Sequence, residues 1–493
     1  MRQTMRDGPP VQRGMQPSRT PSFSPTESKP SYGSVMRNGD HHDGTSRDIE
    51  KDQSTPIAAY RRKSRDAKWA HKEDPFGDEE GAEVKYRTMR WWQAAFIMIA
   101  ETISLGILSL PSALAAVGMV PGIIMIAGLG AVATYTGFVL GQFKLAYPHV
   151  HNIADAGEVL LGPIGREIGG AAQTIFLIFI MGSHILTFTI AMNAITGHAT
   201  CSIVWGVIGF VVLWVFTLPR TLKKVSYLSI ASFISICGAV FITMIGVGVD
   251  PAPNLHLDAT VSTSLAPAFL SVTNIIFAYA GHVAFFSFIS EFRDPTEFPK
   301  ALYLLQATDT TMYLVVAIVV YRYTGDSVSS PALSSTSVTV MKIAYGIALP
   351  TILLAGVIYG HVAAKYIYVR IFRGTQHMSK RTLLSIGSWA GITFLLWLIA
   401  WIIAESIPSF NNLLALISAL FASWFTYGLS GIFWLHLNWG QYGKNWKKIC
   451  LTGLNVCIFG IGAAVCGIGL YASGKAIHDE KGGGSWSCAD TST

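Results

Sequence analysis

Charged residues are scarce in this sequence, and that shortage excludes an ordinary soluble protein. Asp, Glu, Lys and Arg make up 13% of its 493 residues, while 51% are hydrophobic; an average soluble domain is about 25% charged. The basic residues are also unevenly placed, because 17 of the 36 Lys and Arg fall in the first 90 residues. The net charge of +7 therefore does not indicate a nucleic-acid partner. It suits contact with the anionic cytoplasmic face of a lipid bilayer.

Cysteines and nucleotide-binding motifs are also sparse. Six cysteines in a chain of this length do not make a disulfide framework. The sequence has no Walker A motif, which argues against ATP-driven transport, and it indicates neither a metal nor an organic cofactor. Residues 1–90 lack the apolar core of ~7–15 residues that a cleaved signal peptide needs. Their polar, Pro-, Ser- and Arg-rich composition predicts a disordered cytosolic region, open to cytosolic regulators.

From residue 91 onward the sequence alternates between long apolar runs and short polar stretches. A helix needs about 20 mainly apolar residues to span a bilayer. We therefore predict an all-α, polytopic transmembrane domain over residues 91–472, followed by a short extracytoplasmic tail over 473–493. The predicted spans are 92–117, 120–142, 170–196, 202–219, 225–248, 267–290, 301–321, 341–368, 383–404, 411–436 and 449–471.

The loop charges orient these eleven spans. Cytoplasmic loops of membrane proteins carry an excess of Lys and Arg. With the N-terminus inside, the predicted inner loops hold 14 basic residues, whereas the outer loops between spans hold only Arg322, with Lys342 at a border. A miscounted helix would mix the two sets after the error. We therefore predict eleven spans with the N-terminus inside and the C-terminus outside.

Two of the predicted spans carry residues that interrupt a helix. The first contains Gly106 and Pro111 between small polar residues, and a proline removes one helical hydrogen bond and crowds the preceding turn. The sixth has small residues, an aromatic and a histidine over residues 277–282. Paired interruptions at matching points of two halves indicate a transporter site. Free N–H groups there attract a carboxylate and free carbonyls an ammonium, which suits a zwitterionic amino acid.

These residues resemble the amino acid/auxin permease family, and most closely its fungal neutral amino acid permeases of the methyltryptophan-resistance type. The likeness lies in Gly106-Ile-Leu-Ser-Leu-Pro111, Phe277-Ala-Tyr-Ala-Gly-His282, Glu291-Phe-Arg-Asp-Pro295, Gly182-Ser-His184, Phe425-Thr-Tyr-Gly428 and Trp486-Ser-Cys488-Ala-Asp490. It covers residues 92–493. The resemblance implies a LeuT-like fold of 5 + 5 inverted repeats plus one extra helix, and symport of amino acids.

The resemblance also implies a binding site at the two interruptions. The backbone that would hold the carboxylate belongs to Ser104, Leu105, Gly106 and Ile107. Carbonyls of Phe277, Ala278 and Ala280 would receive the ammonium, Tyr279 would line the side-chain pocket, and Gly281 completes the second interruption. The family pattern often has a second glycine where this chain has Ser104, which affects the width of the unwound region.

Ionisable residues within spans are costly and need a reason. A carboxylate or imidazole near the interruptions could carry a coupling proton. The alternative is a purely structural role, in which the side chain is paired with neighbouring groups. The candidates are Glu101, His282, Asp309, His361 and His184. Sodium is the rival coupling ion, but the eighth span offers few hydroxyls to bind it. Glu405 ends the ninth span, where we expect it to be solvated.

Two further features lie outside this core. Cys201 and Cys488 both fall on the predicted outer face, where a disulfide could persist and tie the tail over the outer mouth. Gly428-Leu-Ser-Gly431 matches a short rhomboid-protease pattern, but eleven spans fit that class poorly, and we do not expect an enzyme.

The prediction is proton symport of neutral amino acids, aromatic or large aliphatic, between spans 1, 3, 6, 8 and 10 by alternating access. We expect it at the plasma membrane. A sodium-coupled transporter, a vacuolar transporter and a transporter-like amino acid sensor remain alternatives.

Overall fold

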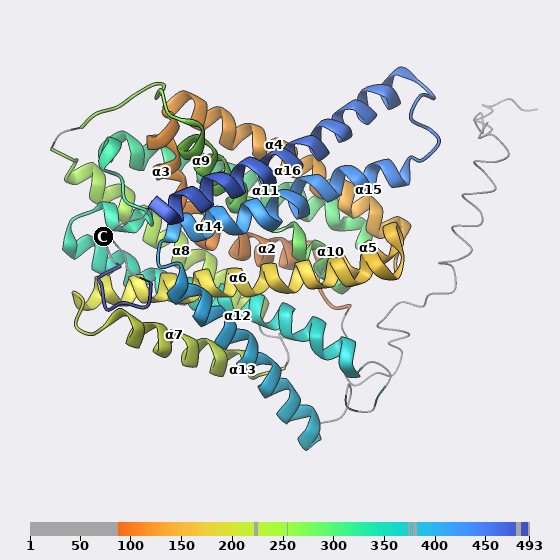
Figure 1. Cartoon of the computed structure of the whole chain (residues 1–493), viewed down its shortest axis with the longest axis horizontal. Helices are drawn as coiled ribbons and strands as arrows, with labels where there is room; N and C mark the ends of the chain where they lie inside the picture. Colours follow the sequence, from red (N-terminus) through yellow and green to blue (C-terminus); the bar gives the residue numbers. More distant parts are fainter. Residues whose placement is uncertain are drawn as a thin grey trace, which may run out of the picture. The chain divides into compact units, whose positions relative to one another are not determined.

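The structure, a computed structural model, describes residues 87–220, 225–253, 255–372, 375, 377, 382–479 and 485–491. The predicted disordered head, 1–90, therefore lies outside the described residues except for its last four. Within the described part, helices dominate, and their order follows the predicted spans (Figure 1).

The predicted first half contains seven α-helices: α2 (Trp91–Gly106), α3 (Leu110–Val117), α4 (Met119–Ala146), α5 (Ile153–Leu161), α6 (Pro163–Thr196), α7 (Ser202–Thr217) and α8 (Val225–Val249). The second half contains α9 (Leu265–Ala278), α10 (His282–Glu291), α11 (Phe298–Thr324), α12 (Val338–Phe372), α13 (Leu383–Ser406), α14 (Phe410–Ile417), a π-helical segment (Ser418–Gly428) and α15 (Leu429–Leu437). The last helix, α16, covers Trp446–Asp479.

Ten helical segments of the described chain are long and apolar enough to cross a membrane. The fourth predicted span corresponds to α7, which is apolar but has only 16 residues. At 1.5 Å per residue it is about 24 Å long, short of the ~30 Å hydrocarbon core. A total of eleven membrane crossings, which requires α7 to cross the membrane, therefore stays a prediction. The side of the membrane on which the N-terminus lies also stays a prediction.

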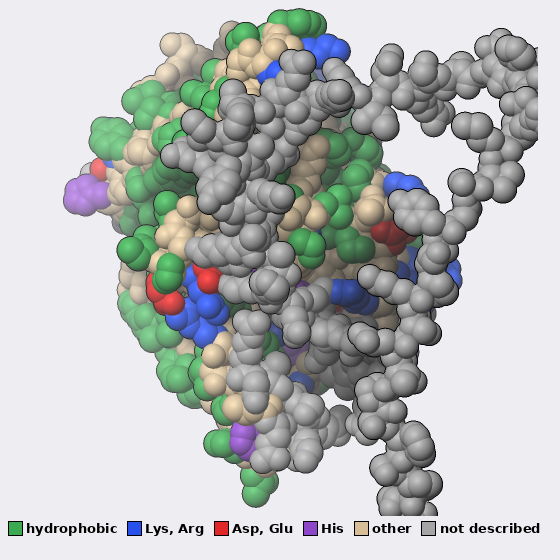
Figure 2. Space-filling view, turned by 90° about the vertical axis from the view of Figure 1, so that its right-hand side faces the viewer, with side chains coloured by type: hydrophobic (Ala, Val, Ile, Leu, Met, Phe, Trp, Pro, Cys, Tyr) green, Lys and Arg blue, Asp and Glu red, His purple; other side chains and the backbone are tan. Residues whose placement is uncertain are grey.

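The burial of each span separates central helices from peripheral ones. In the most apolar stretch of Trp91–Val117, 94% of the residues are buried, and the share is 89% for Leu265–Glu291 and 83% for α6. It is only 28% for α13 and 22% for α16. Hydrophobic side chains cover much of the outer surface visible in Figure 2. Exposed apolar side chains on such helices match a lipid environment, so the first and sixth spans form the protein's interior.

Both central spans are interrupted where the sequence predicts. The first changes from α2 to a tight 3₁₀ turn over Ile107–Ser109 and resumes as α3, with Pro111 near its start. The second stops at Ala278 and resumes at His282. The backbone at the first break stays in right-handed helical torsions, with φ −56° and ψ −44° at Gly106. It is thus a tightened helix rather than an extended stretch.

The two interruptions pack directly against each other. A Cβ atom built on Gly106 would lie 2.5 Å from the Ala278 Cα, and one on Gly281 would lie 2.7 Å from the Thr102 Cγ2. These separations are far below ordinary contact. Glycine at both positions therefore lets the backbones of α2 and the second break approach each other.

Two local features were not predicted. A short helix, α5, lies between the second and third spans, and the Asn152 side chain caps it by accepting a hydrogen bond of 2.9 Å from the Asp155 N–H. The tenth span contains the π-helical segment Ser418–Gly428, an element that often occurs at functional sites.

Candidate functional site

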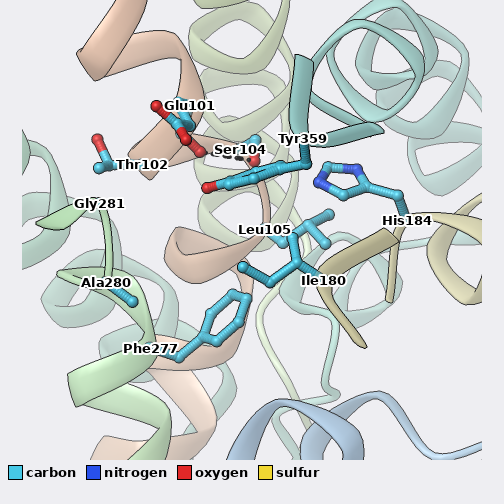
Figure 3. A pocket seen from close by; sticks show the side chains of 10 residues that line it. All are labelled: Glu101, Thr102, Ser104, Leu105, Ile180, His184, Phe277, Ala280, Gly281 and Tyr359. Carbon is cyan, nitrogen blue, oxygen red and sulfur yellow. Dashed lines mark hydrogen bonds between the residues drawn. The ribbon is translucent and has the colours of Figure 1, made fainter. Parts of the chain in front are cut away.

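A small enclosed cavity lies where the two interruptions meet α6 and α12. Its lining comes from four elements that are far apart in sequence (Figure 3). The lining residues are Glu101, Thr102, Ser104, Leu105, Ile180, His184, Phe277, Ala280, Gly281 and Tyr359. The predicted location between spans 1, 3, 6 and 8 thus corresponds to a real cavity, although span 10 contributes no side chain to this lining.

The cavity is contracted in this structure. It offers about 10 Å³ to the centre of a water molecule, which is room for about one water. An amino acid needs more space, so its binding requires some of the lining helices to separate.

Polar groups line one part of the cavity. Glu101 is almost fully buried, and neither of its carboxyl oxygens has a hydrogen-bond partner among the described residues. Ser104 donates to the Glu101 backbone carbonyl at 3.1 Å, and the Tyr359 hydroxyl points toward the Glu101 side of the cavity (Figure 3). A buried carboxyl group without a partner is costly, and a donor on a bound molecule would satisfy it.

Apolar side chains line the opposite part. Figure 3 places Leu105, Ile180 and Phe277 together, on the far side of the Tyr359 ring from Glu101. Leu105 is fully buried, and Phe277 is 9% exposed. The cavity therefore has a polar end and an apolar end, as a ligand with a charged head and an apolar body requires.

Four of the expected binding residues lie outside this cavity lining. Gly106 packs against Ala278, as described above, and Ile107 lies in the 3₁₀ turn with its side chain buried. The Ala278 carbonyl already accepts a 2.7 Å hydrogen bond from the Tyr313 hydroxyl. Tyr279 turns toward α4, where its hydroxyl donates to the Ile126 carbonyl at 3.0 Å. The expected role of Tyr279 in the side-chain pocket is therefore not what the structure shows, because its hydroxyl finds partners on the other side.

His184 and His282 have different surroundings. The Nδ1 atom of His184 lies 2.8 Å from the Ile352 carbonyl, so Nδ1 carries the N–H that donates. Nε2 is then an acceptor at the cavity, and no described residue donates to it. His282 instead lies with Nε2 3.0 Å from the Ala133 carbonyl and 3.0 Å from the Thr136 hydroxyl. His282 therefore ties α10 to α4 and does not line the cavity.

His361 and Asp309 are both buried behind the cavity. The ring of His361 packs on Trp389 of α13, with centroids 5.6 Å apart. Asp309, on α11, forms a hydrogen bond of 2.7 Å through its Oδ2 atom with the hydroxyl of Thr102, which is a cavity-lining residue. Asp309 thus contacts the site through one intermediate side chain, whereas His361 belongs to the α12–α13 interface.

Three cavity residues were predicted from the sequence neither as binding residues nor as proton-coupling candidates. Thr102 directly follows Glu101, Ile180 precedes the Gly182-Ser-His184 motif by two positions, and Tyr359 lies in the eighth predicted span. Helical spacing offers a signal for Ile180, since residues 180 and 184 share one face of α6. No comparable signal identifies Tyr359.

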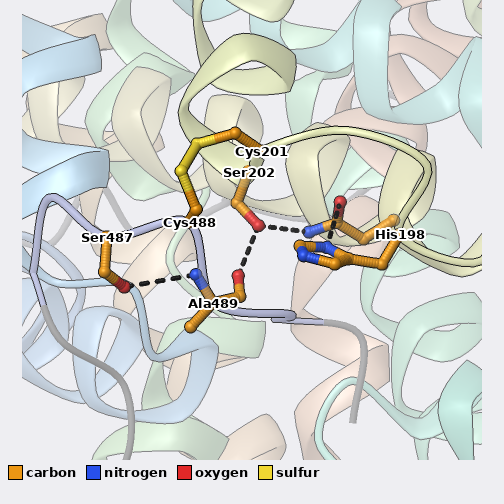
Figure 4. Close-up of a disulfide and its surroundings, with 7 residues drawn as sticks. His198, Cys201, Ser202, Ser487, Cys488 and Ala489 are labelled. Carbon is orange, nitrogen blue, oxygen red and sulfur yellow. Dashed lines mark hydrogen bonds between the residues drawn. A yellow bond between two sulfur atoms is a disulfide. The ribbon is translucent and has the colours of Figure 1, made fainter.

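At one end of the molecule the structure joins Cys201 and Cys488 in a disulfide (Figure 4). The Ser202 hydroxyl donates to the Ala489 carbonyl at 2.5 Å, and Trp486 packs on Trp401 of α13 with centroids 5.4 Å apart. Glu405 lies beneath this tail, buried, and accepts a hydrogen bond from Trp401 at 3.1 Å. The expectation of a solvated Glu405 is wrong because the tail covers it.

The sequence matches the family model described as transmembrane amino acid transporter protein over residues 87–474. The chain belongs to this transmembrane amino acid transporter family. It is 37% identical to the "N amino acid transport system protein" of Neurospora crassa, over 82% of this chain and 89% of that protein. A "transmembrane transporter" of Fusarium pseudograminearum is 32% identical over 72% of this chain and 76% of its own length.

Solved structures place the fold of this family member. MhsT, solved in complex with L-phenylalanine, aligns with a TM-score of 0.50 and 13% identity over 79% of this chain and all of MhsT. An inward-facing structure of Mhp1 also gives 0.50, at 14% identity, over 80% of this chain and 92% of Mhp1. The predicted LeuT-like fold is confirmed, as is the predicted family. The chain is accordingly a transporter-family protein and not an enzyme.

Proposed function

We propose that this transporter imports neutral amino acids with aromatic or large aliphatic side chains together with protons, by alternating access. The observation that carries the proposal is the cavity at the crossing of the two interrupted helices, with Glu101 at one end and Leu105, Ile180 and Phe277 at the other. Membership of an amino acid transporter family supports the substrate class.

The polar end suits the charged head of an amino acid. Among the described residues, neither the Glu101 carboxyl nor the Nε2 atom of His184 has a hydrogen-bond partner, so an ammonium would supply the donors that they lack. The backbone of the first interruption at Ser104 and Leu105 borders the same cavity, and N–H groups near a helix break attract a carboxylate. Gly106 would serve this site by bringing the two breaks together.

The apolar end selects for size and hydrophobicity. A ligand side chain placed beside Phe277 and Ile180 would gain about 25 cal/mol for each Å² of apolar surface that it buries. Charged side chains would lose their hydration there without finding a partner. We therefore expect neutral side chains with substantial apolar surface to bind best.

Two buried carboxyl groups, those of Glu101 and Asp309, are the proposed sites for the coupling proton. Glu101 is buried in the first span and Asp309 in the seventh, and no ion pair involves either of them in the part of the chain that the structure describes. An unpaired carboxylate deep in a membrane protein is costly, which favours a site that binds a proton. We propose the plasma membrane as the location, which fluorescence microscopy of a tagged full-length chain would test.

The proposal is tested by reconstituting the full chain in proteoliposomes and measuring uptake of a panel of amino acids. Aromatic and large aliphatic amino acids should accumulate, and charged ones should not. The Phe277→Ala variant should shift the preference toward larger side chains, whereas Phe241→Ala, which changes an exposed phenylalanine of α8, should not. Uptake of no amino acid by the full-length chain would overturn the proposal and favour a sensor.

A further inference from the structure

Asp309 and Glu101 lie in the same region of the molecule but differ in access to the cavity. Glu101 lines the cavity. Asp309 does not: it is fully buried on α11, and the Thr102 side chain contacts both it and the cavity. A bound amino acid could therefore touch Glu101 directly, while Asp309 would respond to it only through Thr102.

No positively charged side chain among the described residues faces Asp309. The titratable side chains that face it are Tyr279, at the second interruption, and Tyr313, on α11 itself. Glu101 lies one residue from its partner Thr102. Of the other helices packed on α11, α8 carries Cys237. On α4, Lys144 donates to the carbonyls of Pro148 and Val150. Tyr135, also on α4, accepts a hydrogen bond from Asn455.

The hydrogen bonds of Thr102 indicate which protonation state fits this arrangement. Its hydroxyl oxygen lies 2.9 Å from the Met98 carbonyl and 2.7 Å from Asp309 Oδ2. A threonine hydroxyl has a single hydrogen to donate, and a carbonyl can only accept. Both contacts are satisfied together only if Asp309 carries a proton and donates it to Thr102, which then donates to Met98.

Loss of that proton would rearrange the contact. An ionised Asp309 can only accept, so Thr102 would turn its hydrogen from Met98 to Asp309. The same threonine packs against Gly281, where an added Cβ would lie 2.7 Å from the Thr102 Cγ2. Thr102 therefore lies in contact with the proton-binding carboxyl, the cavity and the second interruption.

We propose that the two carboxyl groups have separate roles: Asp309 carries the transported proton, and Glu101 binds the ammonium of the substrate. The inference rests on the proposed proton-coupled transport. In each cycle the Asp309 carboxylate forms one O–H bond with a proton from the outer side and breaks it toward the inner side. Thr102 transmits the change to the second interruption as a positioning residue.

The test uses the reconstituted full chain and two readouts. One is exchange of labelled against unlabelled amino acid without any ion gradient; the other is uphill accumulation under an imposed proton gradient, with entry of protons followed by a dye inside the vesicles. In Asp309→Asn the amide can still donate to Thr102 as a protonated acid does. This variant should keep measurable exchange, reduced by no more than about tenfold, and lose proton-driven accumulation and proton entry.

Glu101→Gln should behave differently. Its KM in exchange should rise at least tenfold, while proton entry at saturating amino acid should persist. Asp326→Asn, which changes an exposed carboxyl group just beyond α11, serves as the matched control and should resemble the unmodified chain. Proton entry that persists in Asp309→Asn, or that vanishes only in Glu101→Gln, would overturn the assignment.

The Thr102 variants keep the inference testable if Asp309→Asn does not fold. Thr102→Ser retains the hydroxyl and should keep coupling, whereas Thr102→Val removes it and should lower the ratio of protons to amino acid. Equal ratios in the two variants would contradict the relay. If the unmodified chain exchanges no amino acid, the proposed function fails; if it exchanges amino acid and only these coupling results fail, the division of roles alone is wrong.

Discussion

Replacement of Gly106 by alanine should strongly impair transport, because this position holds the two interruptions together. The new Cβ would lie 2.5 Å from the Ala278 Cα and 2.9 Å from its Cβ, whereas carbon atoms in contact are about 3.5–4.0 Å apart. Backbone atoms cannot rotate away as a flexible side chain can. The first and second breaks must therefore separate by about 1 Å.

The size of the effect follows from that separation. Extra methyl groups forced into a packed interior cost about 1–3 kcal/mol, which corresponds to a roughly 5- to 150-fold change in an equilibrium. We expect uptake by Gly106→Ala to fall by a factor in that range and uptake by Gly106→Val to be abolished. Gly128→Ala is the matched control, since a Cβ at this exposed position of α4 meets nothing within 4 Å.

The assay is initial uptake of labelled amino acid in proteoliposomes, normalised to the amount of folded protein by size-exclusion chromatography and a melting curve. Gly106→Ala should insert and fold but transport poorly, while Gly128→Ala should transport normally. Equal transport by the two variants would refute the reasoning that the close approach of the interruptions is needed.

Three other predictions concern the ends of the helices. Cys201→Ser removes a cross-link between residues 287 positions apart. Because disulfides typically contribute about 2–4 kcal/mol, the melting temperature of this variant should fall by several degrees, whereas that of Cys237→Ser should not. An unchanged melting temperature in Cys201→Ser would show that the tail contributes little to stability. Lys365 and Glu291 form a 3.4 Å ion pair between α12 and α10, and both side chains are partly exposed. Such a pair contributes about 0–1 kcal/mol, so each single charge reversal should change the rate of amino acid exchange by no more than about fivefold. The double reversal should restore the rate. Burial lowers the pKa of His151 to about 3, below its value of about 6.5 in an unfolded chain. Its stabilising contribution is therefore complete above a pH of about 6.5 and is lost as the pH falls toward about 3. The melting temperature of His151→Gln should fall less on acidification than that of the unmodified chain, and an identical pH profile would contradict this.

The spans and their interruptions could be predicted from the sequence because each rests on a local property. Hydropathy locates an apolar helix, and the predicted span 92–117 agrees with Trp91–Val117 to within one residue. Gly106 and Pro111 weaken the helix by their own covalent structure, so they mark the first break without reference to any neighbour. The extent of unwinding does not follow in the same way, and the break is a 3₁₀ turn.

The lining of the site could be predicted only in part, because it depends on which side chains face each other across helices. Glu101, Ser104, Phe277 and Ala280 line the cavity, and each of them lies beside one of the two breaks that mark the sequence. Tyr279 also lies in a break, but it turns toward α4 and binds the Ile126 carbonyl. That choice depends on the position of a helix more than a hundred residues away.

Other features depend on tertiary contacts that composition does not encode. α5 is a nine-residue helix that lacks the length of a span, so a search for long apolar runs passes over it. Glu405 reads as an exposed helix end until the tail, held by Cys488, is placed over it. In both cases the missing information is what packs on the residue rather than the residue itself.

The central claim is that amino acid and proton move together through the cavity at the two interruptions. The most direct test is to follow the uptake of a large neutral amino acid and the internal pH in the same proteoliposomes, under a proton gradient and then under a sodium gradient. We predict uphill uptake with matching acidification under the proton gradient, and loss of both when an uncoupler dissipates that gradient. Uptake that follows sodium and leaves the internal pH unchanged would contradict the claim.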